Sequence, residues 1–287
     1  MKVLIVGSKG QLGTTLSQTV PPTFSAVSLD LPEFDIADPK AVNDMVEKEN
    51  PGVIINASAY TAVDKSEDES DLAFLVNATG PENLAMAAKK IGCRLIHIST
   101  DYVFDGKVYS PYAPDADCTP LGVYGKSKRQ GEINIEKIID DFLIIRTSWL
   151  YSQYGNNFVL TMLRLMNERD EVNVVADQVG APTWASTLAK AIWAAADKKR
   201  LKGYYHWSDA GVTSWYDFSV AIQEEGLALG LLNRKVPVRP ITSAEFPTKT
   251  TRPPYSVLNC RDSWSDFDVE PVQWRVALRQ MLKGMNT

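Results

Sequence analysis

The sequence predicts an α/β protein with a doubly wound parallel sheet and a smaller C-terminal lobe. In the first half, short apolar runs rich in β-branched residues alternate with amphipathic helical patterns. A glycine-rich segment directly follows the first of these runs. After about residue 146 this rhythm is lost, and tryptophans, prolines and irregular loops become common. Continuous apolar strands separated by helices indicate a parallel sheet that is covered on both faces.

The predicted elements follow in chain order. Strands are expected at residues 2–7, 24–30, 52–58, 93–99 and 141–148, where the apolar runs lie. Helices are expected at residues 11–20, 38–50 and 70–92, and again from about Tyr124. Asp38 is the predicted N-cap of the second helix, with Pro39 in its first turn, and Gly92 ends the third. Ligands of such folds bind at the carboxyl ends of the strands.

The predicted domain division follows the change in rhythm. Residues 1–146, with roughly residues 160–200, are assigned to a Rossmann-type dinucleotide-binding domain. Roughly residues 147–159 and 201–287 are assigned to the smaller lobe, which is expected to bind the substrate. No low-complexity linker separates the two parts, so the lobe is expected to pack against the sheet domain and close its crevice.

Composition excludes several classes of function. The chain has 287 residues and a net charge of −5, which gives no basic footprint for nucleic acid or for a membrane surface. Its three cysteines are far apart and fit neither a disulfide framework nor a zinc site. No apolar stretch approaches the roughly 20 residues of a membrane span. We therefore expect a cytoplasmic protein that binds neither nucleic acid nor membranes.

The glycine-rich segment "GSKGQLG" places Gly7, Gly10 and Gly13 between the first strand and the first helix. A tight turn there brings backbone N–H groups and a helix N-terminus close to a pyrophosphate. The spacing is G-x-x-G-x-x-G and so differs from the standard G-x-G-x-x-G motif. Asp30 ends the second strand, where a carboxylate can accept hydrogen bonds from ribose hydroxyls. A dinucleotide site is the favoured interpretation, against a plain packing turn and a solvated acid.

Polar residues that follow the later strands complete a redox site. Thr100 follows the fourth strand, where its hydroxyl can point into the crevice or simply cap a turn. Tyr124 and Lys128 lie four residues apart on the next helix and share a face. A lysine ammonium near a phenol stabilises phenolate and is expected to lower the tyrosine pKa. His97 is interpreted as a packed strand residue.

These motifs resemble the extended short-chain dehydrogenases/reductases. Within that class, "GQLG", "NASAYTAVDKSE", "STDYVFDG", "YGKSKRQGE", "RTSWLY", "DQVGAPT" and "RPPYSVLN" are similar to the dTDP-4-dehydrorhamnose reductase family. The resemblance runs in order from residue 7 to about residue 259. It implies reduction of the C4 ketone of dTDP-4-dehydro-L-rhamnose to dTDP-L-rhamnose by NADPH or NADH, with a dTDP-sugar as substrate.

The resemblance also implies roles for individual residues. Tyr124, Lys128 and Thr100 are expected to carry the chemistry. The expected cofactor contacts come from the glycine loop and the strand ends, and also include Tyr124 and Lys128: Gly7, Gly10, Gln11, Leu12, Gly13, Asp30, Asp35, Ile36, Ala59, Tyr60 and Thr61. The expected substrate contacts are Thr100, Asp101, Tyr102, Val63, Trp149 and Arg252. For Trp149, Gln178 and Thr183, a purely structural role competes with the functional one.

One feature departs from the family pattern, and another leaves the choice of cofactor open. Thr14 and Thr15 stand where family members often carry an acid that helps bind magnesium at a dimer contact. We therefore predict no metal site and a monomer or weak homodimer. Asp30 would repel a 2′-phosphate whereas Lys9 could attract one, so the choice between NADH and NADPH stays open.

Other functions remain as alternatives. A sugar-nucleotide dehydratase needs an Asp-Glu pair after the threonine, and this chain has Asp101 and Tyr102. Another nucleotide-sugar 4-ketoreductase or epimerase-type enzyme would share most of the site. A non-catalytic role is also open, because the regulatory subunit of methionine adenosyltransferase resembles the same reductases.

Overall fold

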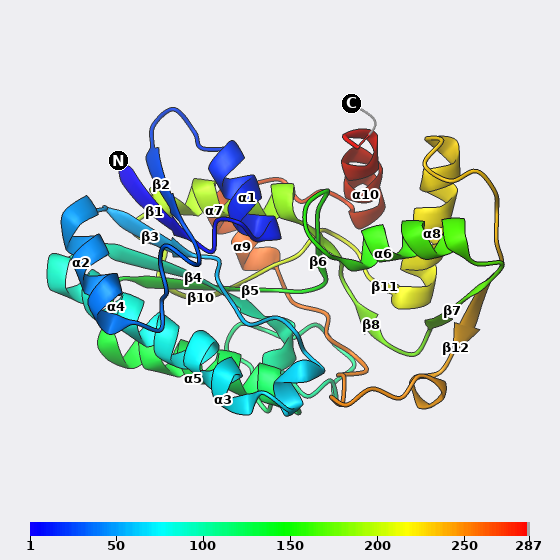
Figure 1. Ribbon diagram of the computed structural model, residues 1–287, viewed down its shortest axis with the longest axis horizontal. Coiled ribbons are helices and arrows are strands. Elements are labelled where there is room, and N and C mark those ends of the chain that lie inside the picture. Colours follow the sequence, from blue (N-terminus) through cyan, green and yellow to red (C-terminus); the bar gives the residue numbers. More distant parts are fainter. Residues whose placement is uncertain (286–287) are drawn as a thin grey trace.

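A six-stranded, all-parallel sheet forms the centre of the computed structural model, which describes residues 1–285 (Figure 1). The strand order is β10-β5-β4-β3-β1-β2. Five strands match the predicted ones: β1 (Lys2–Val6), β2 (Ser25–Leu29), β3 (Val53–Asn56), β4 (Arg94–Thr100) and β5 (Phe142–Thr147). The order reverses between β1 and β3, so the carboxyl ends of these two strands border the crevice where such folds bind ligands. The predicted doubly wound fold is confirmed.

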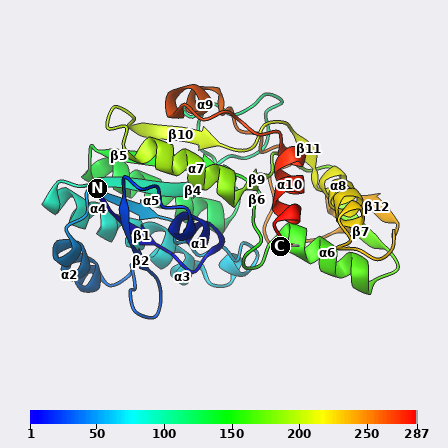
Figure 2. The same cartoon turned by 90° about the horizontal axis from the view of Figure 1, so that it is seen from above.

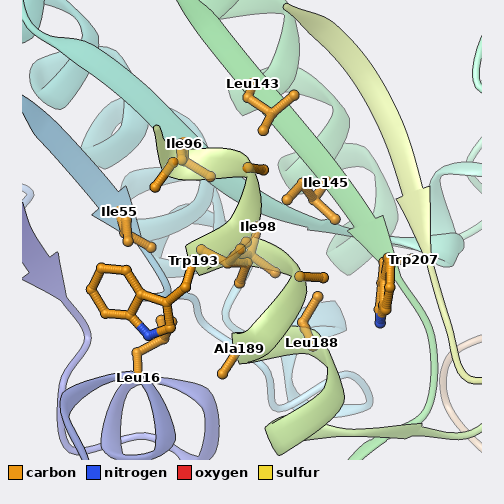
Figure 3. Packing of buried hydrophobic residues seen from close by; sticks show 14 of the residues in the cluster. Leu16, Ile55, Ile96, Ile98, Leu143, Ile145, Leu188, Ala189, Trp193 and Trp207 are labelled. Carbon is orange, nitrogen blue, oxygen red and sulfur yellow. The ribbon is translucent and has the colours of Figure 1, made fainter. Parts of the chain in front are cut away.

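Helices cover both faces of this sheet, as Figures 1 and 2 show. One face packs against α1 (Gln11–Gln18) and α7 (Ala185–Ala196) through side chains such as Leu16, Ile96 and Trp193 (Figure 3). The other face packs against α2 (Pro39–Glu49), α4 (Gly80–Ile91) and α5 (Val123–Ile138). Two apolar layers therefore hold the strand ends, and the loops that leave them, in fixed positions.

Local signals in the sequence explain where the second and third predicted helices begin and end. The Asp38 side chain accepts hydrogen bonds from the backbone N–H groups of Lys40 and Ala41, and Gly92 ends α4 in the left-handed conformation. The long helix at residues 70–92 is divided into α3 (Ser70–Phe74), a π-helical turn η2 (Leu75–Thr79) and α4. A π-helical turn inside a helix often marks a functional site.

The smaller lobe is a separate apolar cluster beside the sheet domain (Figure 2). It contains α6 (Phe158–Glu168), α8 (Trp215–Ala228), α10 (Trp274–Lys283) and the paired strands β7 (Val172–Val175) and β12 (Val238–Ile241). Two short strand pairs lie where the chain passes between the parts: β6 (Leu150–Tyr151) with β9 (Thr183–Trp184), and β8 (Val179–Gly180) with β11 (Thr213–Ser214). The chain therefore passes between the two parts several times.

Three elements differ from the predicted domain boundaries. The α6 helix, inside the range 160–200, packs against α8 in the smaller lobe, because its buried face meets Phe218 and Ile222. Strand β10 (Gly203–Trp207), inside the range 201–287, pairs with β5 as the sixth strand of the main sheet. Its sequence "GYYHW" is aromatic and lacks the apolar run that marked the other strands. The α9 helix (Arg261–Phe267) also packs against β10.

The remaining elements are single 3₁₀ turns in loops: η1 (Lys65–Glu67), η3 (Asp101–Val103) and η4 (Ser243–Glu245). Among residues 1–285, no helix has both the length and the apolar character that crossing a membrane requires.

Candidate active site

The glycine loop connects β1 to α1 and has no room for side chains at two of its glycines. Gly7 has a φ of +81°, and a Cβ there would lie 2.5 Å from the backbone nitrogen of Ser58. A Cβ at Gly13 would lie 2.0 Å from the Gly7 carbonyl oxygen. Gly10 is different, because the nearest atom to its Cβ would be 3.4 Å away. Packing therefore requires glycine at two positions, whereas Gly10 leaves an open approach to the backbone.

Gln11 and Leu12 begin α1 directly after that opening. The helix has Gly10 as its N-cap and no side-chain hydrogen bond to its first N–H groups. An uncapped helix N-terminus favours an anion such as a pyrophosphate. Gln11 also reaches the smaller lobe, since its Oε1 atom accepts a hydrogen bond from the hydroxyl of Ser152 at 3.1 Å. The open helix N-terminus suits the expected pyrophosphate, and Gln11 connects the glycine loop to the smaller lobe.

Asp30 braces the loop from the end of β2. Its Oδ2 atom accepts a 2.7 Å hydrogen bond from the Lys9 backbone N–H, and its Oδ1 atom accepts one of 2.7 Å from Leu31. The Lys9 ammonium lies nearby, 3.0 Å from Glu33 and 2.5 Å from the Leu31 carbonyl oxygen. A carboxylate and a lysine ammonium therefore lie side by side at the end of β2, where the adenosine ribose is expected.

Asp35 and Ile36 lie in the loop between β2 and α2, and the structure separates them by burial. The Asp35 side chain is exposed and accepts a hydrogen bond from the Ala37 N–H at 2.9 Å. Ile36 is buried against Gly80 at the start of α4. The Ile36 side chain thus belongs to the core, and any cofactor contact there would come from its backbone or an edge of its side chain.

The loop after β3 carries Ala59, Tyr60 and Thr61, and the π-helical turn holds it. The backbone N–H of Tyr60 donates to Asn77 Oδ1 at 2.8 Å, and the Asn77 amide donates back to the Tyr60 carbonyl at 3.1 Å. The same amide reaches the hydroxyl of Ser127 on α5, 3.1 Å away. Asn77 therefore fixes this loop relative to the helix that carries Tyr124 and Lys128.

Thr100 and Tyr124 meet at the carboxyl end of β4. The Thr100 hydroxyl donates to Asp101 Oδ1 at 3.1 Å and accepts from the Tyr102 N–H at 3.2 Å. Burial raises the pKa of Tyr124, and the neighbouring Thr100 hydroxyl acts in the opposite direction. The predicted lowering of the Tyr124 pKa by Lys128 is therefore wrong for this structure. A phenol that keeps its proton is nevertheless what a general acid requires.

Lys128 points away from solvent and beneath the site. It is 1% exposed, and its Nζ atom lies 2.7 Å from the Ile98 carbonyl oxygen and 3.2 Å from His97 Nε2. Burial lowers the pKa of Lys128 to about 8, and Glu132 on the same helix opposes this shift. Burial, followed by the charge of Lys128, holds the pKa of His97 well below its usual value.

Three of the predicted substrate residues, Asp101, Tyr102 and Arg252, lie beside Tyr124 at the carboxyl end of β4. The rings of Tyr102 and Tyr124 meet edge to face, with centroids 5.5 Å apart. Burial raises the pKa of Tyr102 to about 12, and that of Asp101 to about 6. Arg252 lies close enough to lower the Tyr102 pKa and pairs with Asp64 at 2.9 Å. One end of β4 thus brings together a hydroxyl, a carboxyl and a guanidinium.

Val63 reaches the same region through the segment that precedes Arg252. The Val63 carbonyl oxygen accepts a 2.9 Å hydrogen bond from the hydroxyl of Thr250. This contact brings residues distant in sequence to one edge of the site.

Trp149 lies where the chain leaves β5 for the smaller lobe. Its φ of +48° is unusual for a tryptophan, and its ring stacks on Trp215 with centroids 3.5 Å apart. A Cβ at Gly180 would lie 2.6 Å from this ring. Gln178 and Thr183 each bond a neighbouring side chain, Ser243 at 3.0 Å and Thr147 at 3.3 Å. All three residues have structural partners, so a ligand role for them stays a prediction.

Three buried side chains of the site had no predicted role: Asn56, Asn77 and Ser127. An asparagine at the end of a strand or inside a helical pattern is indistinguishable in sequence from an ordinary strand-end or helix residue. The only available signal for Asn77 was its place in a helical stretch that the structure divides by a π-helical turn. Their function becomes visible only when β3, β4 and α5 are brought together.

The sheet, the glycine loop and the helix that carries Tyr124 and Lys128 place the chain among the extended short-chain dehydrogenases/reductases. A family model described as the RmlD substrate binding domain matches residues 1–287. The chain therefore belongs to the dTDP-4-dehydrorhamnose reductase family, to which that model corresponds.

Several similar proteins match this chain over nearly its full length. The chain is 39% identical to dTDP-4-dehydrorhamnose reductase of Salmonella typhimurium, covering 100% of this chain and 99% of the relative. It is 40% identical to the spore coat polysaccharide biosynthesis protein SpsK of Bacillus subtilis, covering 98% and 97%. A solved dTDP-4-dehydrorhamnose reductase of Bacillus anthracis, in complex with NADP, superposes with a TM-score of 0.93 at 36% identity, covering 100% and 99%.

Proposed function

We propose that this protein reduces the C4 ketone of dTDP-4-dehydro-L-rhamnose to give dTDP-L-rhamnose. The observation that carries the proposal is the meeting of Thr100 and a protonated Tyr124 at the carboxyl end of β4, on the same sheet edge as the glycine loop. The chain's full-length relatives include proteins named dTDP-4-dehydrorhamnose reductase. The choice of sugar rests on those relatives.

The residues have distinct tasks in this reaction. When bound, the reduced nicotinamide cofactor supplies the hydride. Tyr124 gives its phenolic proton to the ketone oxygen, and Thr100 holds that oxygen by a hydrogen bond. Lys128 restores the proton of Tyr124. Burial of Tyr124 keeps the phenol protonated until the oxygen gains negative charge.

The cofactor is held at one end of the sheet. The backbone from Gly7 to Gly13 and the start of α1 receive the pyrophosphate, and Asp30 receives the adenosine ribose. The solved relative from Bacillus anthracis carries NADP, and Lys9 stands beside Asp30 here. We propose that both NADPH and NADH serve, with Lys9 supporting the phosphorylated form.

The sugar nucleotide lies between the sheet domain and the smaller lobe. Asp101, Tyr102 and Arg252 surround the position of the ketone, and Arg252 offers its charge to the diphosphate. Val63 and Trp149 are proposed to border the sugar and its nucleotide.

A spectrophotometric assay tests the proposal. Enzymatically prepared keto sugar is added with NADPH or NADH, and loss of absorbance at the nicotinamide band is followed. Consumption of cofactor with formation of dTDP-L-rhamnose supports the proposal. If the protein reduces only a different 4-keto sugar, it is another nucleotide-sugar reductase. Cofactor binding without turnover of any keto sugar would favour a non-catalytic subunit.

The assembly state is part of the same proposal. Thr14 and Thr15 offer hydroxyls where magnesium prefers carboxylates. We expect activity that EDTA does not change, and a monomer or weak homodimer in analytical ultracentrifugation. A dimer that dissociates on chelation would contradict this expectation.

A further inference from the structure

A chain of polar side chains runs beneath the site from the loop after β3 to Lys128. Asn56 ends β3 and His97 lies beside it on β4, where the two residues are register partners. The Asn56 Nδ2 atom is 3.0 Å from His97 Nδ1, and His97 Nε2 is 3.2 Å from Lys128 Nζ. All three side chains are fully or almost fully buried. Bulk water therefore does not compete for these hydrogen bonds.

The direction of the chain is fixed at Asn56. Its Oδ1 atom accepts a 3.0 Å hydrogen bond from the backbone N–H of Ser58 and a 2.6 Å bond from the Ser58 hydroxyl. A backbone N–H can only donate, so the amide oxygen must face Ser58. The Asn56 NH₂ group must then face His97, and it donates to His97 Nδ1.

The tautomer of His97 follows from this direction. A neutral imidazole carries one proton, and Nδ1 is already an acceptor. The proton is therefore on Nε2, where it points at Lys128. The ring is neutral because burial and the neighbouring Lys128 hold its pKa far below the usual value.

The hydrogen-bond count at Lys128 now differs between its two protonation states. An ammonium has three N–H donors and no lone pair, so it cannot accept the N–H of His97. A neutral amine accepts that bond, donates to the Ile98 carbonyl oxygen at 2.7 Å, and keeps one N–H for the site. A donor that faces a donor in a buried place costs free energy, so this contact destabilises the ammonium relative to the amine and lowers the pKa of Lys128.

We propose that Asn56 and His97 form a one-way hydrogen-bond chain that ends on Lys128 and favours its neutral amine over its ammonium. His97 is then a positioning residue that acts through Lys128. The other titratable groups near Lys128 on its own helix are Tyr124, one turn earlier, and Glu132, one turn later. Glu132 favours the ammonium, but Arg146 holds it at 2.9 Å and weakens that effect.

The chain has a use in the proposed reaction, on which this part of the inference rests. After Tyr124 has given its proton to the ketone oxygen, its phenolate takes a proton from the Lys128 ammonium. Lys128 becomes an amine, which the N–H of His97 stabilises. Lys128 then regains a proton from solvent water before the next turnover. A chain that lowers the free energy of the amine makes Lys128 a more ready proton donor.

The first test reads the tautomer directly, without substrate or cofactor. The chain has only two histidines, so protein labelled with ¹⁵N-histidine gives two sets of ring signals. His206 is an internal control, because its Nδ1 atom faces the Tyr112 carbonyl oxygen at 3.1 Å and must carry the proton. We expect opposite neutral tautomers, Nε2–H for His97 and Nδ1–H for His206. A His97 signal of the Nδ1–H tautomer or of a charged ring near pH 7 overturns the proposal.

The second test reverses the chain. Asn56→Asp keeps the shape of the side chain but replaces the donor with an acceptor, so His97 must turn its proton to Nδ1. Nε2 then accepts from Lys128, and the ammonium is favoured. His97→Leu removes the N–H that faces Lys128 and does not depend on a buried carboxylate.

The readout for both variants is the titration of Lys128, followed by NMR of ¹³Cε-lysine and assigned with Lys128→Met. We expect its midpoint to move upward from about 8 by at least one pH unit, a tenfold change in the protonation equilibrium. The same shift should appear in the pH profile of kcat, with little change in KM. An unchanged Lys128 midpoint in folded variants overturns the proposal. An enzyme that shows these NMR signals but reduces no keto sugar would refute only the proposed reaction.

Discussion

The pair Gly10→Ala and Gly13→Ala separates cofactor binding from folding in the glycine loop. The Gly10 backbone is extended, with φ −73° and ψ 170°, which alanine adopts without strain. Its added methyl would meet nothing closer than 3.4 Å. Folding stability should therefore change by less than about 0.5 kcal/mol, the usual range of substitutions that disturb no packing.

Gly13→Ala makes the same chemical change where there is no space. The methyl would lie 2.0 Å from the Gly7 carbonyl oxygen, more than an ångström inside normal contact. Either the loop or α1 must move, and we expect a loss of about 1–3 kcal/mol or more, as for other overpacked sites. This variant is the matched control for the expected position of the pyrophosphate.

Two measurements distinguish the variants. Thermal or urea unfolding reports stability, and quenching of tryptophan fluorescence during titration with NADPH reports cofactor affinity. We expect Gly10→Ala to unfold like the wild type and to bind NADPH at least roughly tenfold more weakly, because a methyl group displaces the pyrophosphate from the backbone N–H groups. Wild-type affinity in a folded Gly10→Ala protein would refute the assignment of this loop to the cofactor.

Three further predictions address the acid, a buried carboxyl and a buried ion pair. Tyr124→Phe should lower turnover by roughly 10²–10⁴-fold with little loss of cofactor affinity, since it removes only the proton donor. Tyr151→Phe is the control: it deletes a buried hydroxyl of the smaller lobe that has no hydrogen-bond partner, and it should leave turnover unchanged. Burial raises the pKa of Asp209 to about 7, so the folded protein holds a proton that the unfolded chain releases near pH 4, and stability should fall as the pH rises from about 4 to 7. Asp209→Asn should reduce this fall in a series of melting curves, and an unchanged slope would contradict the assignment. Glu132→Gln should lower the free energy of unfolding by about 3–5 kcal/mol, because it leaves the guanidinium of Arg146 buried without its carboxylate; a loss below about 1 kcal/mol in urea unfolding would show that the pair is solvated.

The sequence by itself determined the sheet and the glycine loop. Strands β1 to β5 have four to seven residues, and each contains a short apolar stretch that is recognisable without knowledge of its neighbours. The caps at Asp38 and Gly92 are equally local, since a side chain or a missing side chain within one helical turn decides them. Gly7, Gly10 and Gly13 were visible as regularly spaced glycines between the first strand and the first helix.

Tertiary structure decided the features that depend on distant partners. Strand β10 has an aromatic sequence and becomes a strand because β5 offers it an unpaired edge. Helix α6 has an apolar face that would suit either part of the molecule, and contact with α8 assigns it to the smaller lobe.

The electrostatics of the site were decided in the same way. Spacing placed Tyr124 and Lys128 on one face of a helix, but burial in the folded protein is the main cause of both pKa shifts. The smaller contributions come from residues 100–102 at the end of β4 for Tyr124 and from Glu132 on the same helix for Lys128. His97 lies 31 residues from Lys128 in sequence, and Asn56 lies 41 residues from His97. Parallel pairing of β3 with β4 brings these residues into contact, and no local pattern contains the register of that pairing. The sequence therefore identified the groups that carry the proposed chemistry, whereas the fold determines which of them hold protons.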